Sequence, residues 1–391
     1  MGFKQTATHR YGKGSYHQIG LVRGQFGNMP YEPWVKFCQD SGFDGWEEAS
    51  WELDLRQCDT DAGAAAYAKQ RVDLAKKHGL EIFTVATHLQ GQCLGDEPSA
   101  KTLNFQGSNT EARKAYKAWR DAGNMPPRTD PYYVPDNVGK LIHEQSTKDL
   151  LACVRFAGHL SKLQDRKVAL PGFVGSPAHC WSHWFLFPPL PDSMDGHKIP
   201  DVRDVSLEIL VERFGPIWDE CKKYGVTFDL ECHPSERAMG DIESASDYIN
   251  FMCKKGYEGV VGFNLDGSHM EWQNVSVVQF IREFPEFIHC AHVKGVWVAR
   301  EHCRAGRLGG HRPMGHRDNG WNFVTAGTAR DANSLEEIFI ELNRVGFDGA
   351  VSIEWEDNDQ EQHAGAKTAL ANCRKADVPP SGMRHDEMLK G

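Results

Sequence analysis

The segment VGFDGAVSIEWED (residues 345–357) contains the pattern on which the fold prediction depends. A glycine, an aromatic residue, an acid and a second glycine precede the apolar run 350–353. Glycine after a helix supplies the left-handed cap that ends it, and a short apolar run after such a turn predicts a buried strand. The pattern recurs in SGFDGWEEA (41–49) and KGYEGVVGFNLD (255–266), so the chain repeats a unit of helix, tight turn and strand.

A second version of this unit occurs in KKHGLEIFTVATH (76–88) and KKYGVTFDLECH (222–233), where a polar helix end stops at glycine before an apolar strand. Together these signals predict eight strands, near 18–26, 43–49, 80–88, 168–175, 226–232, 260–266, 288–294 and 349–355. Helices are expected at 31–41, 60–78, 146–163, 204–223, 243–254, 275–284 and 334–345. Alternating strands and helices indicate a parallel sheet, and eight such units predict a closed (β/α)8 TIM barrel with its chemistry at the carboxyl ends of the strands.

We expect residues 1–391 to form a single domain, because no linker composition divides the chain. Two segments are too long for simple connections, near 89–145 after the third strand and near 295–333 after the seventh. Each is expected to be a long loop, either a lid or subunit contact or plain surface decoration. The stretch 376–391 is expected to be a polar tail.

The charge and the cysteine content of the chain narrow the classes of protein to which it can belong. The chain has 44 Lys and Arg against 54 Asp and Glu, a net charge of −10, which argues against a general nucleic-acid binder. The eleven cysteines form no CxxC pair, so we expect reduced, mostly buried thiols and a cytoplasmic protein. The first residues lack the apolar region of a secretory signal, and no apolar run is long enough to span a membrane.

An ionisable group follows each of the last four apolar runs. These groups are Glu231, Asp266, His292 and Glu354. Neighbouring strand ends of a barrel converge, and three carboxylates that meet there cannot all stay ionised unaided. Three carboxylate oxygens and one imidazole nitrogen suit Mn²⁺, which we expect, or alternatively Mg²⁺, Co²⁺ or Zn²⁺. The alternative is that each acid caps a helix or pairs with an arginine.

With these residues the chain resembles the xylose isomerase-like TIM barrel family of sugar phosphate isomerases and epimerases. The motifs that carry the resemblance are the glutamate that ends FDLE, DGSH after the sixth strand, the histidine of AHVKG and the glutamate of SIEWED. The resemblance implies that Glu231, Asp266, His292 and Glu354 are metal ligands and that His269 contacts substrate or metal-bound water. Members are often oligomers, so a homo-oligomer is left open.

The predicted chemistry is an enediolate reaction. A metal that chelates a carbonyl and the adjacent hydroxyl acidifies the intervening carbon-bound proton, which a carboxylate can remove or return. Glu231 and Glu354 suit this role on a small carbohydrate substrate. Reprotonation gives epimerisation or isomerisation, whereas loss of a neighbouring group gives a lyase or dehydratase on a 3-oxo-glycoside or inosose. An endonuclease IV-like abasic-site nuclease and a silent sugar-binding subunit are the remaining alternatives.

Further residues are expected at the site, each with a structural alternative such as packing, an ion pair or a turn. His233 and Lys294 are candidate acid, base or charge-neutralising groups. The candidate substrate contacts are His269, His88, Glu47, His179, Trp181 and Arg300. One departure from the family is Val298, where several epimerases have an arginine, so Arg300 is the nearest substitute.

Overall fold

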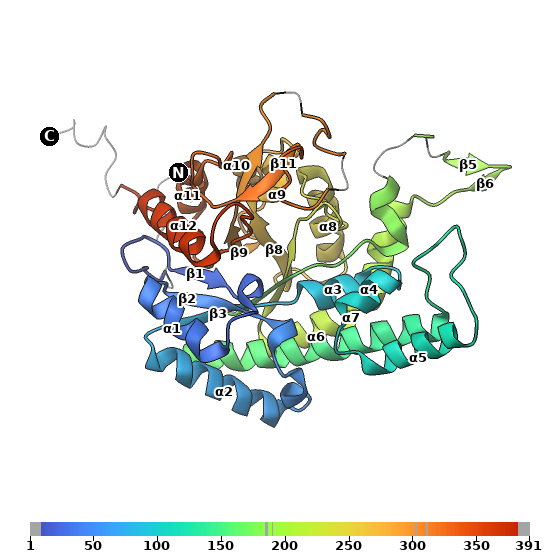
Figure 1. The fold of residues 1–391 in the computed structure, drawn as a ribbon, viewed down its shortest axis with the longest axis horizontal. Coiled ribbons are helices and arrows are strands. Elements are labelled where there is room, and N and C mark those ends of the chain that lie inside the picture. Colours follow the sequence, from blue (N-terminus) through green and yellow to red (C-terminus); the bar gives the residue numbers. More distant parts are fainter. Residues whose placement is uncertain (1–8, 184–186, 190, 302, 310–311, 382–391) are drawn as a thin grey trace. The chain divides into compact units, whose positions relative to one another are not determined.

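The structure is a computed structural model that describes residues 9–183, 187–189, 191–301, 303–309 and 312–381. Its centre is a closed barrel in the strand order β1-β12-β9-β8-β7-β4-β3-β2 (Figure 1). The barrel strands are β1 Ile19–Val22, β2 Gly45–Ala49, β3 Glu81–Ala86, β4 Ala169–Gly172, β7 Thr227–Glu231, β8 Val261–Asp266, β9 Ile288–Val293 and β12 Ala350–Ile353. Each overlaps one predicted strand, so the (β/α)8 prediction is confirmed.

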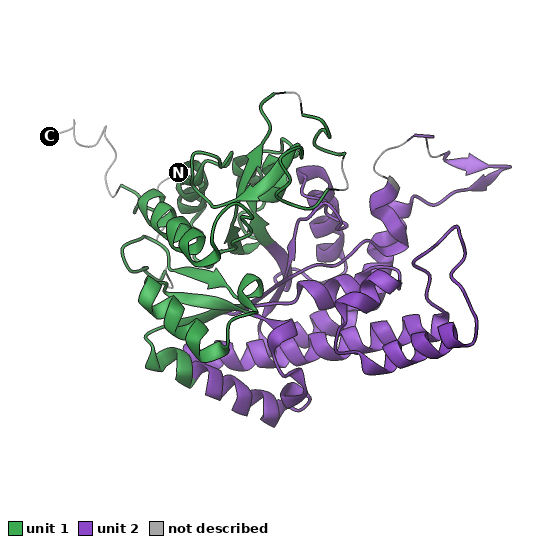
Figure 2. Ribbon diagram, in the orientation of Figure 1, with its two compact units in different colours: residues 1–48, 73–84, 264–391 green, residues 49–72, 85–263 purple. Residues whose placement is uncertain are grey.

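The chain is organised in two compact units (Figure 2). Unit 1 comprises residues 1–48, 73–84 and 264–391, and unit 2 comprises residues 49–72 and 85–263. Both units contribute strands to the barrel.

In unit 1, β1 pairs in parallel with β2 and β12, and β12 pairs with β9 in a register that places Ser352 opposite His292. The helices are α1 Tyr31–Ser41, α9 Gly267–Glu271, α10 Val277–Glu283, α11 Leu335–Val345 and α12 Gln362–Ala376. The repeated glycines explain the turn before β12. Gly346 ends α11 with φ 77°, and a Cβ at Gly349 would lie 2.1 Å from the carbonyl oxygen of His289.

The segment 295–333 of unit 1 contains a hairpin of β10 Gly295–Val298 and β11 Trp321–Val324. Trp321 stacks on Trp272 with ring centroids 4.8 Å apart, so the hairpin has an apolar contact of its own. Residues 382–391 of the expected polar tail lie outside the described residues, and its start is held in place. Asp377 is buried and accepts a hydrogen bond of 2.6 Å from the backbone N–H of His17, which fastens the chain beyond α12.

Unit 2 contains most of the long helices. α6 Asp136–Gln164, which begins ten residues before its predicted start, packs on α7 Val202–Tyr224. α8 Ile242–Lys254 follows β7, and α2 Asp61–Lys77 follows two single turns, η2 Ser50–Glu52 and η3 Leu55–Cys58. β5 Ser193–Met194 and β6 His197–Lys198 form a small exposed hairpin.

The expected loop near 89–145 is largely helical, which corrects the prediction. It contains α3 His88–Gly95, α4 Ala100–Phe105 and α5 Thr110–Asp121 before α6 begins (Figure 1). Cys93, Leu103, Ala112 and Val138 pack into a separate apolar cluster beneath these helices. This buried surface stabilises the insertion as a structured element.

The structure also bears on the predictions about the cysteines and about membrane-spanning segments. All eleven cysteines are free and most are buried. In the described part of the chain, no helix combines the length and apolarity that crossing a membrane requires.

Candidate active site

The predicted ligands lie where buried strands end. Glu231 and Asp266 are the last residues of β7 and β8, His292 is the residue before the last of β9, and Glu354 directly follows β12. All four are buried. Burying an ionised carboxylate costs several kcal/mol unless a cation or hydrogen-bond donors compensate, so the partners of these groups decide what the site can do.

Three of the ligands converge within unit 1. Asp266, His292 and Glu354 each offer a ligand atom within 4.8 Å of the others. Asp266 also ends β8 as the N-cap of α9, where its Oδ1 accepts a hydrogen bond of 2.8 Å from the backbone N–H of Ser268. This bond fixes the carboxylate while Oδ2 remains directed to the cluster.

Lys294 supplies positive charge to this cluster. Its Nζ lies 2.6 Å from Glu354 Oε2 and 3.0 Å from Asp266 Oδ2. The ammonium also lies 4.4 Å from the centre of the Phe323 ring. The ion pair that sequence reasoning gave as the alternative role of Lys294 is therefore present, and it offsets part of the repulsion between the two carboxylates.

Glu47, which was expected to contact a sugar, instead contacts Thr84 and His292. It is fully buried, accepts a hydrogen bond of 2.6 Å from the Thr84 hydroxyl, and has Oε2 3.0 Å from Nε2 of His292. An ionised carboxylate can only accept, so Nε2 of His292 is the donor. The other ring nitrogen, Nδ1, faces the predicted ligand Glu354, with Oε2 at 3.4 Å.

Gln25 and Glu356 complete the unit 1 part of the site. Gln25 Nε2 donates to Glu354 Oε1 at 2.9 Å and to Glu356 Oε1 at 3.3 Å. Burial raises the pKa of Glu356; nearby Lys294 opposes this effect and nearby Glu354 adds to it. Sequence reasoning missed Gln25, although a polar residue shortly after the first strand is a signal that could have identified it.

His269, the residue expected from DGSH, is buried in the same cluster. Its Nε2 lies 3.4 Å from Asp266 Oδ2 and accepts a hydrogen bond of 3.2 Å from Lys294 Nζ. Its ring meets Phe323 edge-on at 5.4 Å. The arrangement therefore places His269 beside a predicted ligand and beside the buried ammonium group.

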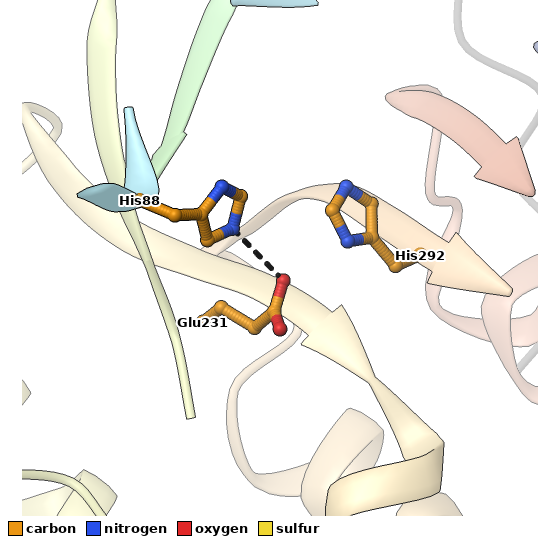
Figure 3. A group of neighbouring side chains, drawn as sticks. All are labelled: His88, Glu231 and His292. Carbon is orange, nitrogen blue, oxygen red and sulfur yellow. Dashed lines mark hydrogen bonds and ion pairs between the residues drawn. The ribbon is translucent and has the colours of Figure 1, made fainter. Parts of the chain in front are cut away.

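In unit 2, Glu231 pairs with a histidine. Figure 3 shows the contact between His88 Nε2, at the start of α3, and Glu231 Oε2, a distance of 3.1 Å. The Phe173 ring meets His88 edge-on at 4.7 Å and covers it with apolar surface. The two residues expected at the ends of the third and fifth strands are thus direct partners.

His233 is held by a turn, which was the predicted alternative to a catalytic role. Its Nδ1 lies 2.8 Å from the hydroxyl of Ser235. The nearby Glu236, which sequence reasoning missed, is fully buried and accepts hydrogen bonds from the backbone N–H groups of Val174 and Gly175. Burial raises the pKa of Glu236 well above its usual range.

His179 and Trp181 belong to a strained turn, η4 Pro177–His183, in unit 2. Ala178 and His179 have φ values of 53° and 52°, in the left-handed region that non-glycine residues rarely adopt. The backbone N–H of Ala178 donates to Glu97 Oε1 at 2.9 Å, which helps to hold this geometry. Trp181 is half exposed, so its ring is available to a ligand.

Arg300 does not join the buried cluster. It is exposed in the segment after β10, and Val298 is partly buried at the end of that strand. Arg300 therefore does not replace the missing family arginine in the buried cluster.

The unit 1 donor set fits a divalent cation. Two carboxylates and one imidazole lie within 4.8 Å of one another, and Nδ1 of His292 faces Glu354. Oxygen and imidazole ligands without thiolates suit Mn²⁺, Mg²⁺, Co²⁺ or catalytic Zn²⁺. Asp266, His292 and Glu354 would hold such an ion.

Comparisons with known proteins agree with the fold. A family model described as "Xylose isomerase-like TIM barrel" matches residues 143–376. The uncharacterized protein YfiH of Bacillus subtilis (strain 168) is 30% identical over 121 residues, or 31% of this chain. The match spans 39% of the length of that curated relative.

Two solved structures are similar at low sequence identity. D-psicose 3-epimerase from Clostridium cellulolyticum H10, solved with D-tagatose, has a TM-score of 0.52 and 15% identity, and the match covers 92% of this chain and 99% of that one. A probable 3-DHS dehydratase from Bacillus anthracis has a TM-score of 0.52 and 13% identity, with 91% and 99% covered. At these identities the likeness concerns the fold.

Proposed function

Because the chain belongs to the xylose isomerase-like TIM barrel family, we propose that it is a divalent-metal-dependent isomerase or epimerase of a sugar or sugar derivative. The observation that carries the proposal is the buried convergence of Asp266, His292 and Glu354 around Lys294. A barrel that needed only stability would place apolar side chains at these positions, since buried charges are weak stabilisers.

We propose Glu231 as the fourth ligand. It ends β7, which neighbours β8 in the barrel order, and parallel strands of a barrel end at the same face. His88 contacts Oε2 of Glu231, so this carboxylate already has a fixed orientation. Mn²⁺ is the metal that we propose, since it accepts this mixture of oxygen and imidazole ligands.

The bound cation would polarise a substrate carbonyl and its neighbouring hydroxyl, which lowers the pKa of the intervening C–H. Glu354 then removes the proton, because its ion pair with Lys294 at 2.6 Å favours the ionised carboxylate. As the second carboxylate of the proposed site, Glu231 would return a proton. The Lys294 ammonium also neutralises the negative charge that develops on the substrate oxygens.

The test is proton exchange in heavy water, measured by NMR on a panel of ketoses and 3-oxo-sugars. Wild-type protein with Mn²⁺ should exchange one carbon-bound proton, and chelator-treated protein should not until Mn²⁺ returns. Glu354→Gln should lose exchange while keeping its circular dichroism spectrum. Glu336→Gln, at an exposed position of α11, is the matched control and should exchange normally. Full activity of Glu354→Gln would refute the proposal.

The proposed lyase alternative shares the enolate step and differs in the fate of the enolate. Loss of water or of an aglycone changes the mass of the substrate, whereas isomerisation and epimerisation do not. Mass spectrometry of the same reactions therefore separates the two outcomes.

A further inference from the structure

Unit 2 contains a large cavity beside the residues that surround Glu231. It has a volume of about 940 Å³ and is bounded by the turns after β2, by the α4 region and by α6. Small-molecule sites range from about 300 to 1,000 Å³, so the cavity is at the upper end of that range. The proposed enolate chemistry needs only the reacting carbons of a substrate and does not account for this space.

Two aromatic rings line the cavity without being buried. Trp51 is 37% exposed and Phe105 is 48% exposed, and both belong to the cavity wall. Large aromatic side chains bury about 150–250 Å² each when they pack, so leaving two of them open to one cavity sacrifices stability. Flat apolar rings of this kind match the C–H faces of a sugar or an aromatic aglycone.

The polar groups of the wall are held in place by hydrogen bonds. Gln90 Oε1 accepts a bond of 2.8 Å from the Ser50 hydroxyl, which leaves the amide nitrogen of Gln90 as a donor. Asp149 Oδ1 accepts a bond of 2.7 Å from Gln145 Nε2. Fixed amides and carboxylates mixed with aromatic rings suit a ligand with several hydroxyl groups.

The charges of the wall disfavour an anionic ligand. The acids are Glu52, Asp54, Asp59 and Asp149, and the bases are Arg56 and Lys148. Arg56 already pairs with Asp54 at 3.0 Å, and Lys148 with Asp59 at 3.2 Å. The net charge is therefore negative, which disfavours a phosphate or carboxylate and favours a neutral polyhydroxylated group.

Trp51 connects the cavity to the candidate active site. Its ring lies 6.4 Å from the ring of His88, and His88 contacts Glu231 (Figure 3). We propose that the cavity binds the second sugar or aglycone of a neutral glycoside whose first sugar carries a carbonyl group and reacts at Glu231. This inference rests on the proposed function and deepens it, because it makes the substrate a glycoside rather than a free or phosphorylated monosaccharide.

Calorimetric binding tests this inference without turnover. The full-length protein, treated with chelator, is titrated with glucose, glucose 6-phosphate, maltose, cellobiose, sucrose and phenyl β-D-glucoside. At least one neutral two-part ligand should bind about tenfold more tightly than glucose or its phosphate. Phe105→Ala should remove about that factor, whereas Phe187→Ala, at a residue that is 89% exposed and outside the cavity wall, should not.

Several results would overturn the inference. They are equal affinity for glucose and all two-part ligands, tighter binding of the phosphate, and an unchanged affinity in Phe105→Ala. Trp51→Ala provides a second variant, and Trp51→Phe should restore part of the affinity because it keeps an aromatic face. Proton exchange tests the enolate chemistry separately, so glycoside binding without exchange would refute only the proposed function, and exchange without glycoside binding would refute only this inference.

Discussion

His292 and Glu47 form a buried pair in which Nε2 of the imidazole lies 3.0 Å from Oε2 of the carboxylate, and each side chain is 1% exposed. The pair fixes the ring so that Nδ1 faces Glu354. A carboxylate behind a metal-ligating histidine orients the ring and raises the basicity of the other ring nitrogen. Glu47 is thus a positioning residue for the proposed metal ligand.

Replacing Glu47 should weaken metal binding more than it weakens the fold. Glu47→Gln keeps the shape but removes the charge, and its amide group can present a donor to the imidazole. We expect Mn²⁺ affinity to fall roughly 10- to 100-fold, the usual effect of losing such a partner. Titration of apo-protein with Mn²⁺, followed by electron paramagnetic resonance, measures the change.

The conservative variant Glu47→Asp keeps the charge and should recover part of this affinity. The circular dichroism spectra of both variants should match that of the wild type. Unchanged Mn²⁺ affinity in Glu47→Gln would show that the carboxylate does not position His292.

Removing the buried charge of Lys294 should destabilise the metal-free protein. Lys294→Met leaves Asp266 and Glu354 without their ammonium partner, a change that typically costs about 3 to 5 kcal/mol. Bound Mn²⁺ should reduce this loss, because a cation then compensates the same carboxylates. Urea unfolding with chelator and with Mn²⁺ measures both values.

A surface lysine supplies the control for this comparison. Lys140 is 77% exposed and pairs with Glu144 at 3.7 Å, so Lys140→Met should change the unfolding free energy by less than about 1 kcal/mol. An equally small loss in Lys294→Met without metal would mean that its ion pairs contribute little to the fold.

The stability of the segment after β11 should depend on pH through Asp331. Burial raises the pKa of Asp331 to about 6, although backbone N–H groups of Gly327, Val296 and Asn333 oppose the shift. The folded state therefore binds the proton more tightly than the unfolded chain, whose pKa is about 3.9. This contribution to stability is complete below about pH 4 and is lost as pH rises through about 6.

Asp331→Asn cannot titrate and should lack this part of the pH profile. Relative to the variant, the wild type should lose unfolding free energy between about pH 4 and pH 6. Chemical unfolding at a series of pH values measures the difference. Asp219 has a side chain that is 66% exposed, so the unfolding free energy of Asp219→Asn should change with pH in parallel with that of the wild type. A parallel change in Asp331→Asn would contradict the prediction.

The strained turn before Trp181 predicts a stabilising substitution. Ala178 has φ 53° and ψ 26°, a conformation that costs a non-glycine residue roughly 1 to 2 kcal/mol. Ala178→Gly should therefore raise the unfolding free energy, by about 1 kcal/mol after the greater flexibility of the unfolded chain is counted. Ala118→Gly, on the exposed face of α5, should lower it by about 1 kcal/mol instead. A loss in both variants would mean that the turn carries no strain.

The strand predictions succeeded because the signals were local. Gly42, Gly225 and Gly346 end the helices α1, α7 and α11, and an apolar run follows each, so helix, turn and strand are marked within about a dozen residues. The insertion near 89–145 lacked such a signal. The helices of this insertion are stabilised by an apolar cluster that includes Leu103 and Val138, residues far apart in the chain.

The sequence predicted most residues of the candidate site but only some of the contacts between them. Strand ends identified Asp266, His292 and Glu354, which converge in unit 1. Glu47 was identified as a candidate, yet its role beside His292 depends on a contact between residues 245 positions apart. Gln25 was missed, since its contact with Glu354 spans 329 positions. The role of Glu231 as a fourth ligand stays a prediction.

The sequence by itself determined the barrel and the candidate ligands, because cap glycines, apolar runs and strand-end acids act over a few neighbouring residues. Only the tertiary structure decided which of those side chains are partners. Lys294 neutralises Glu354 and Asp266, Glu47 orients His292, and Trp51 opens onto a cavity. These relationships depend on distances of a few ångströms between distant parts of the chain, over which charge and hydrogen bonding act and which no local pattern encodes.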